Sequence, residues 1–206
     1  MQKTIADRRA FRAWQIEHER ATPNVGEMAP DFELHDANGQ NPVKLSSFRG
    51  KKPVALIFGS YTWPPYVTGT VRLSDLYKTY QDRIQFLTIY IREAHPVDGW
   101  WFGKGLPKLL FRLQRSKAAF DVYDPKTMEE RRKVAGECET ALQYGIHTYV
   151  DEMDDAVSRA YAAAPTRLYL IGKDGRVAYK GGLGPFGFHP SELDKAIKNY
   201  LKSSVE

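Results

Sequence analysis

Two kinds of hydrophobic pattern alternate along the chain. Continuous apolar runs between breakers, at 53–60 and 84–91, predict strands buried on both faces of a sheet. Residues 67–80 lie between them and carry apolar side chains at helical spacing. Pro64 and Pro65 suit the first turn of that helix, where amides have no intrahelical acceptor. A buried strand, a tight turn and a helix therefore follow one another directly.

Weaker patterns extend this order on both sides. Further strands, helices and a C-terminal hairpin are expected, with strands at 30–34 and 146–150, a lead-in at 43–48, helices at 126–144, 154–163 and 192–201, and hairpin strands at 167–171 and 177–180. This order predicts an α/β fold, a thioredoxin-like three-layer sandwich with a mixed central sheet.

The N-terminal segment reads as an addition to that sandwich. Residues 5–20 place apolar side chains at loose helical spacing among many charges, and Pro23 follows them. We therefore predict an N-terminal helical extension at 1–22 and one thioredoxin-like domain at 23–206.

A basic segment interrupts this domain around 101–122. Within it, residues 104–117 place leucines on one helical face and lysines and arginines on another. Such a helix suits an anionic membrane surface or a protein partner, and it equally suits leucines that pack on their own domain.

Composition narrows the class of protein. The 206 residues are 42% hydrophobic and 13% aromatic, which can fill one sizeable core. A net charge of +5 without a clustered basic groove does not indicate nucleic acid. No stretch has the apolar length of a signal-peptide core or of a membrane span of about 20 residues, so we expect a soluble, cytoplasmic protein.

Candidate chemistry centres on the turn 59–66. In a thioredoxin-like fold the reactive group lies where the first core strand meets the next helix, whose amides favour negative charge. An ordinary proline-terminated loop with an aromatic plug is the alternative.

Three motifs resemble the iodothyronine deiodinase family. Residues 58–66 (FGSYTWPPY) are similar to its active-site turn, in which selenocysteine or cysteine stands immediately before Pro-Pro. Residues 90–100 (YIREAHPVDGW) are similar to its signature after the second core strand. The third match combines APTRLY at 164–169 with YKGGLGP at 179–185. Trp63 occupies the selenocysteine or cysteine position.

The resemblance implies reductive removal of iodine from an iodinated or phenolic small molecule. An external thiol would regenerate the enzyme, and no further cofactor is expected. The indole of Trp63 cannot act as the nucleophile, because its nitrogen lone pair belongs to the ring.

The same motifs supply the other candidate catalytic residues. By resemblance His95 binds or protonates the phenol, and Ser60 and Thr62 can hydrogen-bond the group at position 63. Glu93 and Asp98 flank His95 as a possible acid–base pair, with solvated loop charges as the alternative.

Three further residues are assigned to substrate binding. Pro165 is the candidate for the cis proline that faces the reactive turn in this fold. Arg167 can pair with a phenolate or carboxylate, or it lies on a solvated strand face. Trp100 closes the second motif.

Metal chemistry and a cysteine cycle find no support. The five histidines are scattered, and Cys138 is the only cysteine, which excludes an intramolecular disulfide. We interpret Cys138 as a helix-packing thiol rather than a substitute nucleophile.

Two functions stay open. In the first, residue 63 is natively selenocysteine and the protein is a reductase. Selenocysteine is encoded by UGA, which some translation tables and some near-cognate readings turn into tryptophan. In the second, the chain is a redox-inactive binding protein with Trp63 as an aromatic wall.

Overall fold

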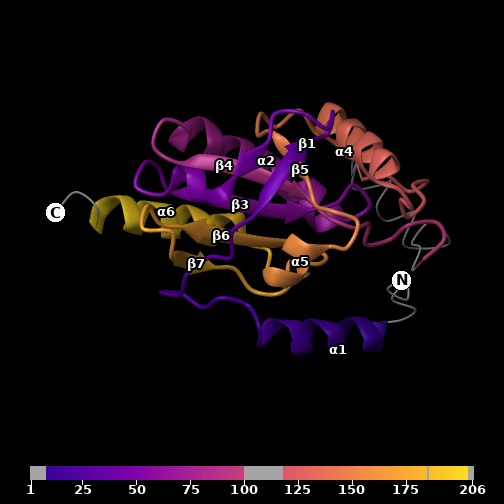
Figure 1. Ribbon diagram of the computed structural model, residues 1–206, viewed down its shortest axis with the longest axis horizontal. Helices are drawn as coiled ribbons and strands as arrows, with labels where there is room; N and C mark the ends of the chain where they lie inside the picture. Colours follow the sequence, from indigo (N-terminus) through magenta and orange to yellow (C-terminus); the bar gives the residue numbers. More distant parts are fainter. Residues whose placement is uncertain (1–7, 100–117, 185, 204–206) are drawn as a thin grey trace.

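A seven-stranded mixed sheet forms the centre of the molecule (Figure 1). The computed structural model describes residues 8–99, 118–184 and 186–203. The strand order is β2-β1-β5-β4-β3-β6-β7. The strands are β1 (Glu33–Asp36), β2 (Val43–Lys44), β3 (Val54–Gly59), β4 (Gln85–Tyr90), β5 (Thr148–Val150), β6 (Arg167–Ile171) and β7 (Val177–Lys180).

Strands β3, β4 and β5 run parallel, and β6 is antiparallel to β3. The carboxyl ends of β3, β4 and β5 and the amino end of β6 therefore share one edge of the sheet. Every residue of β3 is buried, as its continuous apolar run predicts. The turn after β3 lies at this edge, and so does the loop that begins after β4.

Helices cover both faces of the sheet. α2 (Pro64–Tyr80), α4 (Met128–Leu142) and α6 (Pro190–Ser203) pack their apolar side chains on one face. α5 (Ala156–Ala160) packs on the other face, together with the chain that leads into β1. The three-layer thioredoxin-like architecture is confirmed.

The N-terminal helix α1 (Arg8–Glu19) runs along the α5 side of the sheet (Figure 1). Ile16, part of its expected apolar pattern, is 50% exposed, whereas the neighbouring polar Gln15 is buried. At these positions α1 therefore turns a polar residue, not an apolar one, toward the domain.

Several predicted boundaries differ from those of the structure, most clearly those of the first strand and of the helix expected at 154–163. The first strand is Glu33–Asp36 rather than 30–34, because the pairing with β5 involves His35 and Asp36. The helix expected at 154–163 is limited to Ala156–Ala160, because Asp155 and Ala162 both take positive φ angles. Neither change moves the shared edge of the sheet.

The predicted basic segment at 104–117 lies outside the described residues. Within the part of the chain that is described, no helix has the length and apolar character needed to cross a membrane.

Candidate functional site

The turn between β3 and α2 is shaped by glycine and proline. A side chain at Gly59 would lie 2.2 Å from the ring of Tyr66, so only glycine fits beneath that ring. The amide of Trp63 donates to the carbonyl of Ser60 at 3.2 Å and closes the turn. Trp63 is the N-cap of α2, and two prolines follow it.

Those prolines change the electrostatics expected at the turn. Pro64 and Pro65 carry no N–H group, so the start of α2 offers fewer amide donors than an ordinary helix. A negative charge at residue 63 would therefore rely on the helix dipole and on neighbouring side chains.

Glu93, three residues beyond β4, binds this turn through Thr62. Its Oε2 accepts the amide of Thr62 at 2.9 Å and the Thr62 hydroxyl at 2.6 Å. Its Oε1 accepts a hydrogen bond from the hydroxyl of Tyr90. The Tyr90 oxygen in turn accepts the amide of Tyr61 at 3.2 Å. The carboxylate thus links the carboxyl ends of β3 and β4.

His95 lies on the other side of the same threonine. Its amide donates to Thr62 Oγ1 at 3.0 Å, and its ring centroid lies 5.2 Å from that of Trp63, at an interplanar angle of 32°. His95 is 3% exposed and Trp63 is 7% exposed. Residue 63 and the imidazole are therefore in direct aromatic contact.

Burial controls the acidity of this group of residues. It raises the pKa of the Glu93 carboxyl, although the hydrogen bonds from Thr62 and Tyr90 act in the opposite direction. Burial, together with the charge of Glu93, holds the pKa of Tyr90 well above its usual value. Glu93 is thus a carboxyl group that retains a proton at a higher pH than usual, as an acid catalyst requires.

Two polar atoms of the turn have no hydrogen-bond partner among the described residues. They are Ser60 Oγ and Trp63 Nε1, and both are buried. A buried tryptophan N–H usually has an acceptor, and an unpaired donor costs about 1–3 kcal/mol. Within the described residues, the indole is packed but its N–H is not satisfied.

The structure brings Ser60, Thr62, Trp63, Glu93 and His95 together, as the motifs predict. Asp98 does not join them. It accepts the amide of Asp124 at 2.8 Å and pairs with Lys126 at 3.0 Å, and so organises the loop beyond the site. An acid–base pair of Glu93 with Asp98 finds no support in these contacts.

Pro165 follows a cis peptide bond, as predicted. The hydroxyl of the next residue, Thr166, donates to the carbonyl of Phe58 at 2.6 Å, which joins this loop to the end of β3. A contact between Pro165 and a ligand stays a prediction. Trp100 lies outside the described residues.

Arg167 lies on the opposite face of the sheet from Trp63. It is directly opposite Phe58 of β3, and its guanidinium stacks over Tyr169, both of which belong to the α5-side core. Glu19 of α1 binds it at 2.5 and 3.0 Å. The alternative that Arg167 lies on a solvated strand face is wrong, because its side chain is 1% exposed. These contacts tie it to α1 rather than to the turn.

Cys138 belongs to the core between α4 and the sheet, where it is 2% exposed. Burial, and then the charge of Glu93, raise the pKa of its thiol well above the usual value. It is therefore a packing thiol, as expected, and not a thiolate nucleophile.

The sequence interpretation missed Tyr90 as part of the site. The residue lies inside the second motif, three positions before Glu93, but nothing in an apolar strand marks its hydroxyl as functional. The hydroxyl groups of Tyr66, Tyr144 and Thr88 form a second buried hydrogen-bonded group, which the sequence interpretation also missed.

No group of metal-binding side chains is present in the described ranges.

Sequence comparison gives a consistent result. The sequence model of iodothyronine deiodinase matches residues 5–201. The thyroxine 5-deiodinase of Sparus aurata is 33% identical over 183 residues, which cover 88% of this chain and 63% of the relative. That of Gallus gallus is 35% identical over 185 residues, which cover 86% and 63%. The chain thus spans somewhat less than two thirds of these curated relatives.

Solved structures share the fold at lower identity. A hypothetical protein from Sinorhizobium meliloti superimposes with a TM-score of 0.59 at 21% identity, covering 88% of this chain and 86% of the other. A putative thiol:disulfide interchange protein DsbE from Chlorobium tepidum gives 0.58 at 17% identity, covering 87% and 99%. The sheet and its helices are thus those of thioredoxin-like proteins.

Proposed function

Because the chain belongs to the iodothyronine deiodinase family, we propose that it is a thioredoxin-fold reductase that removes iodine from an iodinated phenol. Residue 63 is the reacting position in this proposal. The substrate class follows from the family, and the individual phenol is left open.

One observation carries the proposal. A buried carboxyl group with a raised pKa, Glu93, is hydrogen-bonded to the turn directly beside residue 63, and His95 stacks on that residue. An acid and an imidazole next to one side chain suit a reaction in which that side chain attacks and a proton is delivered.

We further propose that residue 63 is selenocysteine in the cell. The tryptophan indole has no lone pair to donate, and its buried N–H lacks an acceptor among the described residues. A small, polarizable selenolate would have neither disadvantage. The UGA codon that encodes selenocysteine, decoded as tryptophan, accounts for the residue in the sequence.

The proposed reaction has two stages. The selenolate donates an electron pair to iodine, the carbon–iodine bond breaks, and the ring carbon takes a proton, supplied through Glu93 and His95. An external thiol then displaces iodide from selenium, and a second thiol releases the selenolate and a disulfide. The sum converts the iodinated phenol and two thiols into the phenol, a disulfide and hydrogen iodide.

The partners follow from this chemistry. The reductant is an external thiol, because Cys138 is buried and, as the only cysteine, cannot form an internal disulfide. The proposal includes no resident redox cofactor. A cytoplasmic location would supply that thiol. Nucleic acid has no part in the proposal. The basic segment 104–117 is a candidate contact with a membrane surface or a protein partner.

The redox-inactive alternative rests on the contact between Trp63 and His95. If the tryptophan is native, its ring is an aromatic wall that binds ligands without turnover.

A gain-of-function experiment separates the two. The full chain would be prepared as wild type, Trp63→Cys and Trp63→Ser, and iodide release from 2-iodophenol would be measured with and without dithiothreitol. We expect thiol-dependent release by the cysteine variant and none by the other two, because serine is similar in size but a poor nucleophile. A folded but inactive cysteine variant, or equal release by the tryptophan chain, would overturn the proposal.

A further inference from the structure

Gln15 of α1 reaches from the N-terminal helix into the domain. Its side chain is 7% exposed, and its amide nitrogen donates to the carbonyl of Ala164 at 3.2 Å and to the carbonyl of Gly184 at 2.8 Å. One carboxamide therefore connects two loops that lie about 20 residues apart in the chain.

Both carbonyl groups immediately precede a proline. Pro165 and Pro185 have no N–H, so neither loop can use an amide at that position to bind the other. The loops nevertheless approach closely, because a side chain at Gly184 would lie 3.0 Å from the carbonyl of Thr166 and 3.3 Å from Pro165. Gln15 supplies the donors that the prolines lack.

The two loops border the turn that carries residue 63. Thr166 is bound to the end of β3 through the carbonyl of Phe58. The loop that contains Gly181, Gly182 and Gly184 is called the glycine-rich loop. After it, Phe188 packs edge-on against Tyr66, with ring centroids 6.5 Å apart, and touches Gly69 of α2. A shift of either loop would therefore change the contacts at one end of the turn 59–66, which carries residue 63.

α1 is fixed so that Gln15 keeps this position. Glu19 lies one helical turn further along the same face and pairs with Arg167 and with Lys180, the latter at 3.0 Å. Arg167 is buried and Glu19 is 33% exposed, so the pair is only partly screened by solvent. The polar face of α1 is thus held at both positions.

We propose that Gln15 is a positioning residue, which sets the spacing between the Ala164–Pro165 loop and the glycine-rich loop and thereby the shape of the binding site for the iodinated phenol beside the turn 59–66. The proposal rests on the function proposed above. Gln15 touches neither Glu93 nor Thr62, which are held by β4 and the turn. Its loss should therefore weaken ligand binding and leave the chemical step unchanged.

The test uses Gln15→Met, which keeps the side chain's length and helix propensity and removes both donors. In the Trp63→Cys background we expect KM for 2-iodophenol to rise about tenfold, with kcat within about twofold. Thr22→Val is the matched control, because it loosens α1 at Lys180 but leaves both loop carbonyls paired. It should leave KM unchanged.

Amide hydrogen exchange gives a second readout that needs no turnover. Gln15→Met should speed exchange in peptides covering 161–168 and 181–188, and Thr22→Val should not. Unchanged exchange in those peptides, a fall in kcat with constant KM, or an equal rise of KM in the control would each overturn the proposal.

The two proposals fail in different ways. If Trp63→Cys releases no iodide, the proposed function fails, and the dissociation constant of 2-iodophenol replaces KM as the readout for Gln15. Weakening by about tenfold would still support the positioning role. If iodide is released but Gln15→Met behaves like the control, only the positioning role fails.

Discussion

Two buried carboxyl groups, Glu93 and Asp151, lie just beyond the carboxyl ends of neighbouring strands. Glu93 follows β4, Asp151 follows β5, and the amide of Asp151 donates to the carbonyl of Tyr90 at 2.9 Å. Burial raises the pKa of both groups, that of Asp151 to about 6. Burial and acidity alone therefore do not distinguish them.

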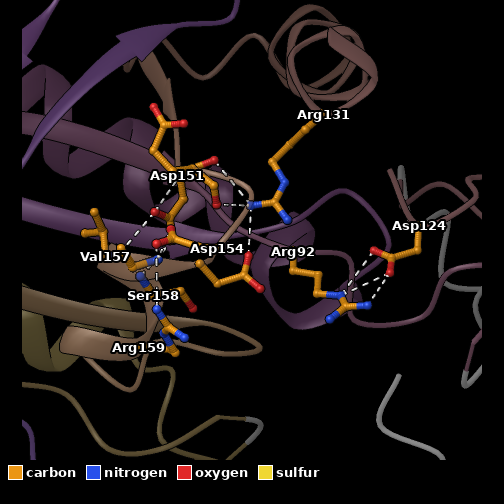
Figure 2. Close-up of polar contacts among 11 residues, drawn as sticks. Arg92, Asp124, Arg131, Asp151, Asp154, Val157, Ser158 and Arg159 are labelled. Carbon is orange, nitrogen blue, oxygen red and sulfur yellow. Dashed lines mark hydrogen bonds and ion pairs between the residues drawn. The ribbon is translucent and has the colours of Figure 1, made fainter. Parts of the chain in front are cut away.

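Their partners do distinguish them. Asp151 accepts hydrogen bonds from the backbone amides of Glu152, Val157 and Ser158, and so caps the start of α5 (Figure 2). Arg131 completes this group by binding the carbonyls of Asp151 and Glu152 and the carboxylate of Asp155.

Glu93 is held by the turn 59–66 instead. Three of its contacts are with Thr62 and Tyr90, and residue 63 is next in the chain. The raised pKa alone therefore does not mark a functional site, and it is the position of Glu93 beside the proposed reacting residue that makes it the candidate acid. We expect changes at the Asp151 group to alter stability, and changes at the Glu93 group to alter turnover.

The largest expected effect is on the structural side. Arg131→Met should lower the free energy of unfolding by about 3–5 kcal/mol, because it leaves Asp155 and two carbonyls without their buried cation. Urea denaturation measures it. Arg159→Met, which breaks an exposed pair with Asp154, is the control and should change stability by less than about 0.5 kcal/mol. Equal losses would contradict the structural role of Arg131.

The pH dependence of stability should reveal Asp151. Its folded pKa of about 6 lies above the usual value of 3.8 for an aspartate, so the folded state binds the proton more tightly. This contribution is complete below about pH 4 and is lost as pH rises through 6, which amounts to about 3 kcal/mol. Urea titrations from pH 4 to 7 should show that wild type loses this stability relative to Asp151→Asn. Parallel curves would exclude the raised pKa.

Glu93→Gln should affect turnover. In the Trp63→Cys background we expect kcat for 2-iodophenol to fall about 100-fold, with KM within about threefold, because glutamine cannot deliver a proton. Steady-state kinetics measures both. Asp98→Asn should leave kcat within about twofold, since Asp98 pairs with Lys126. A loss shared by both variants would place the acid elsewhere.

The smallest effect is expected from Trp63→Phe. It removes some packing and also removes the buried N–H, which lacks an acceptor in the part of the chain that the structure describes, so stability should change by less than about 1 kcal/mol. Leu73→Ala, in fully buried core, should cost about 2–5 kcal/mol. Calorimetric unfolding compares them. A loss at Trp63 as large as at Leu73 would show that the indole is well accommodated.

Local pattern was enough to predict the strand, turn and helix around the site. The continuous apolar run of β3 and the prolines of α2 placed the turn. His95 and Glu93 were indicated in a different way, by the resemblance of the motif after β4 to the deiodinase signature, and only the structure shows that both contact Thr62.

Long-range contacts could not be predicted in the same way. Arg167 faces away from the turn because β6 pairs in the register that sets it opposite Phe58, and a one-residue shift would reverse its face. Gln15 resembles any polar residue of a charged helix until α1 is placed over the two proline loops. Tyr90 gains its role only through the position of Glu93.

The identity of residue 63 tests the central claim most directly. Protein purified from its native cells would be analysed by peptide mass spectrometry across Gly59 to Arg72. We predict the mass and isotope pattern of selenium at position 63, as the reductase requires. Tryptophan at that position would contradict the claim and leave the redox-inactive binding protein as the function.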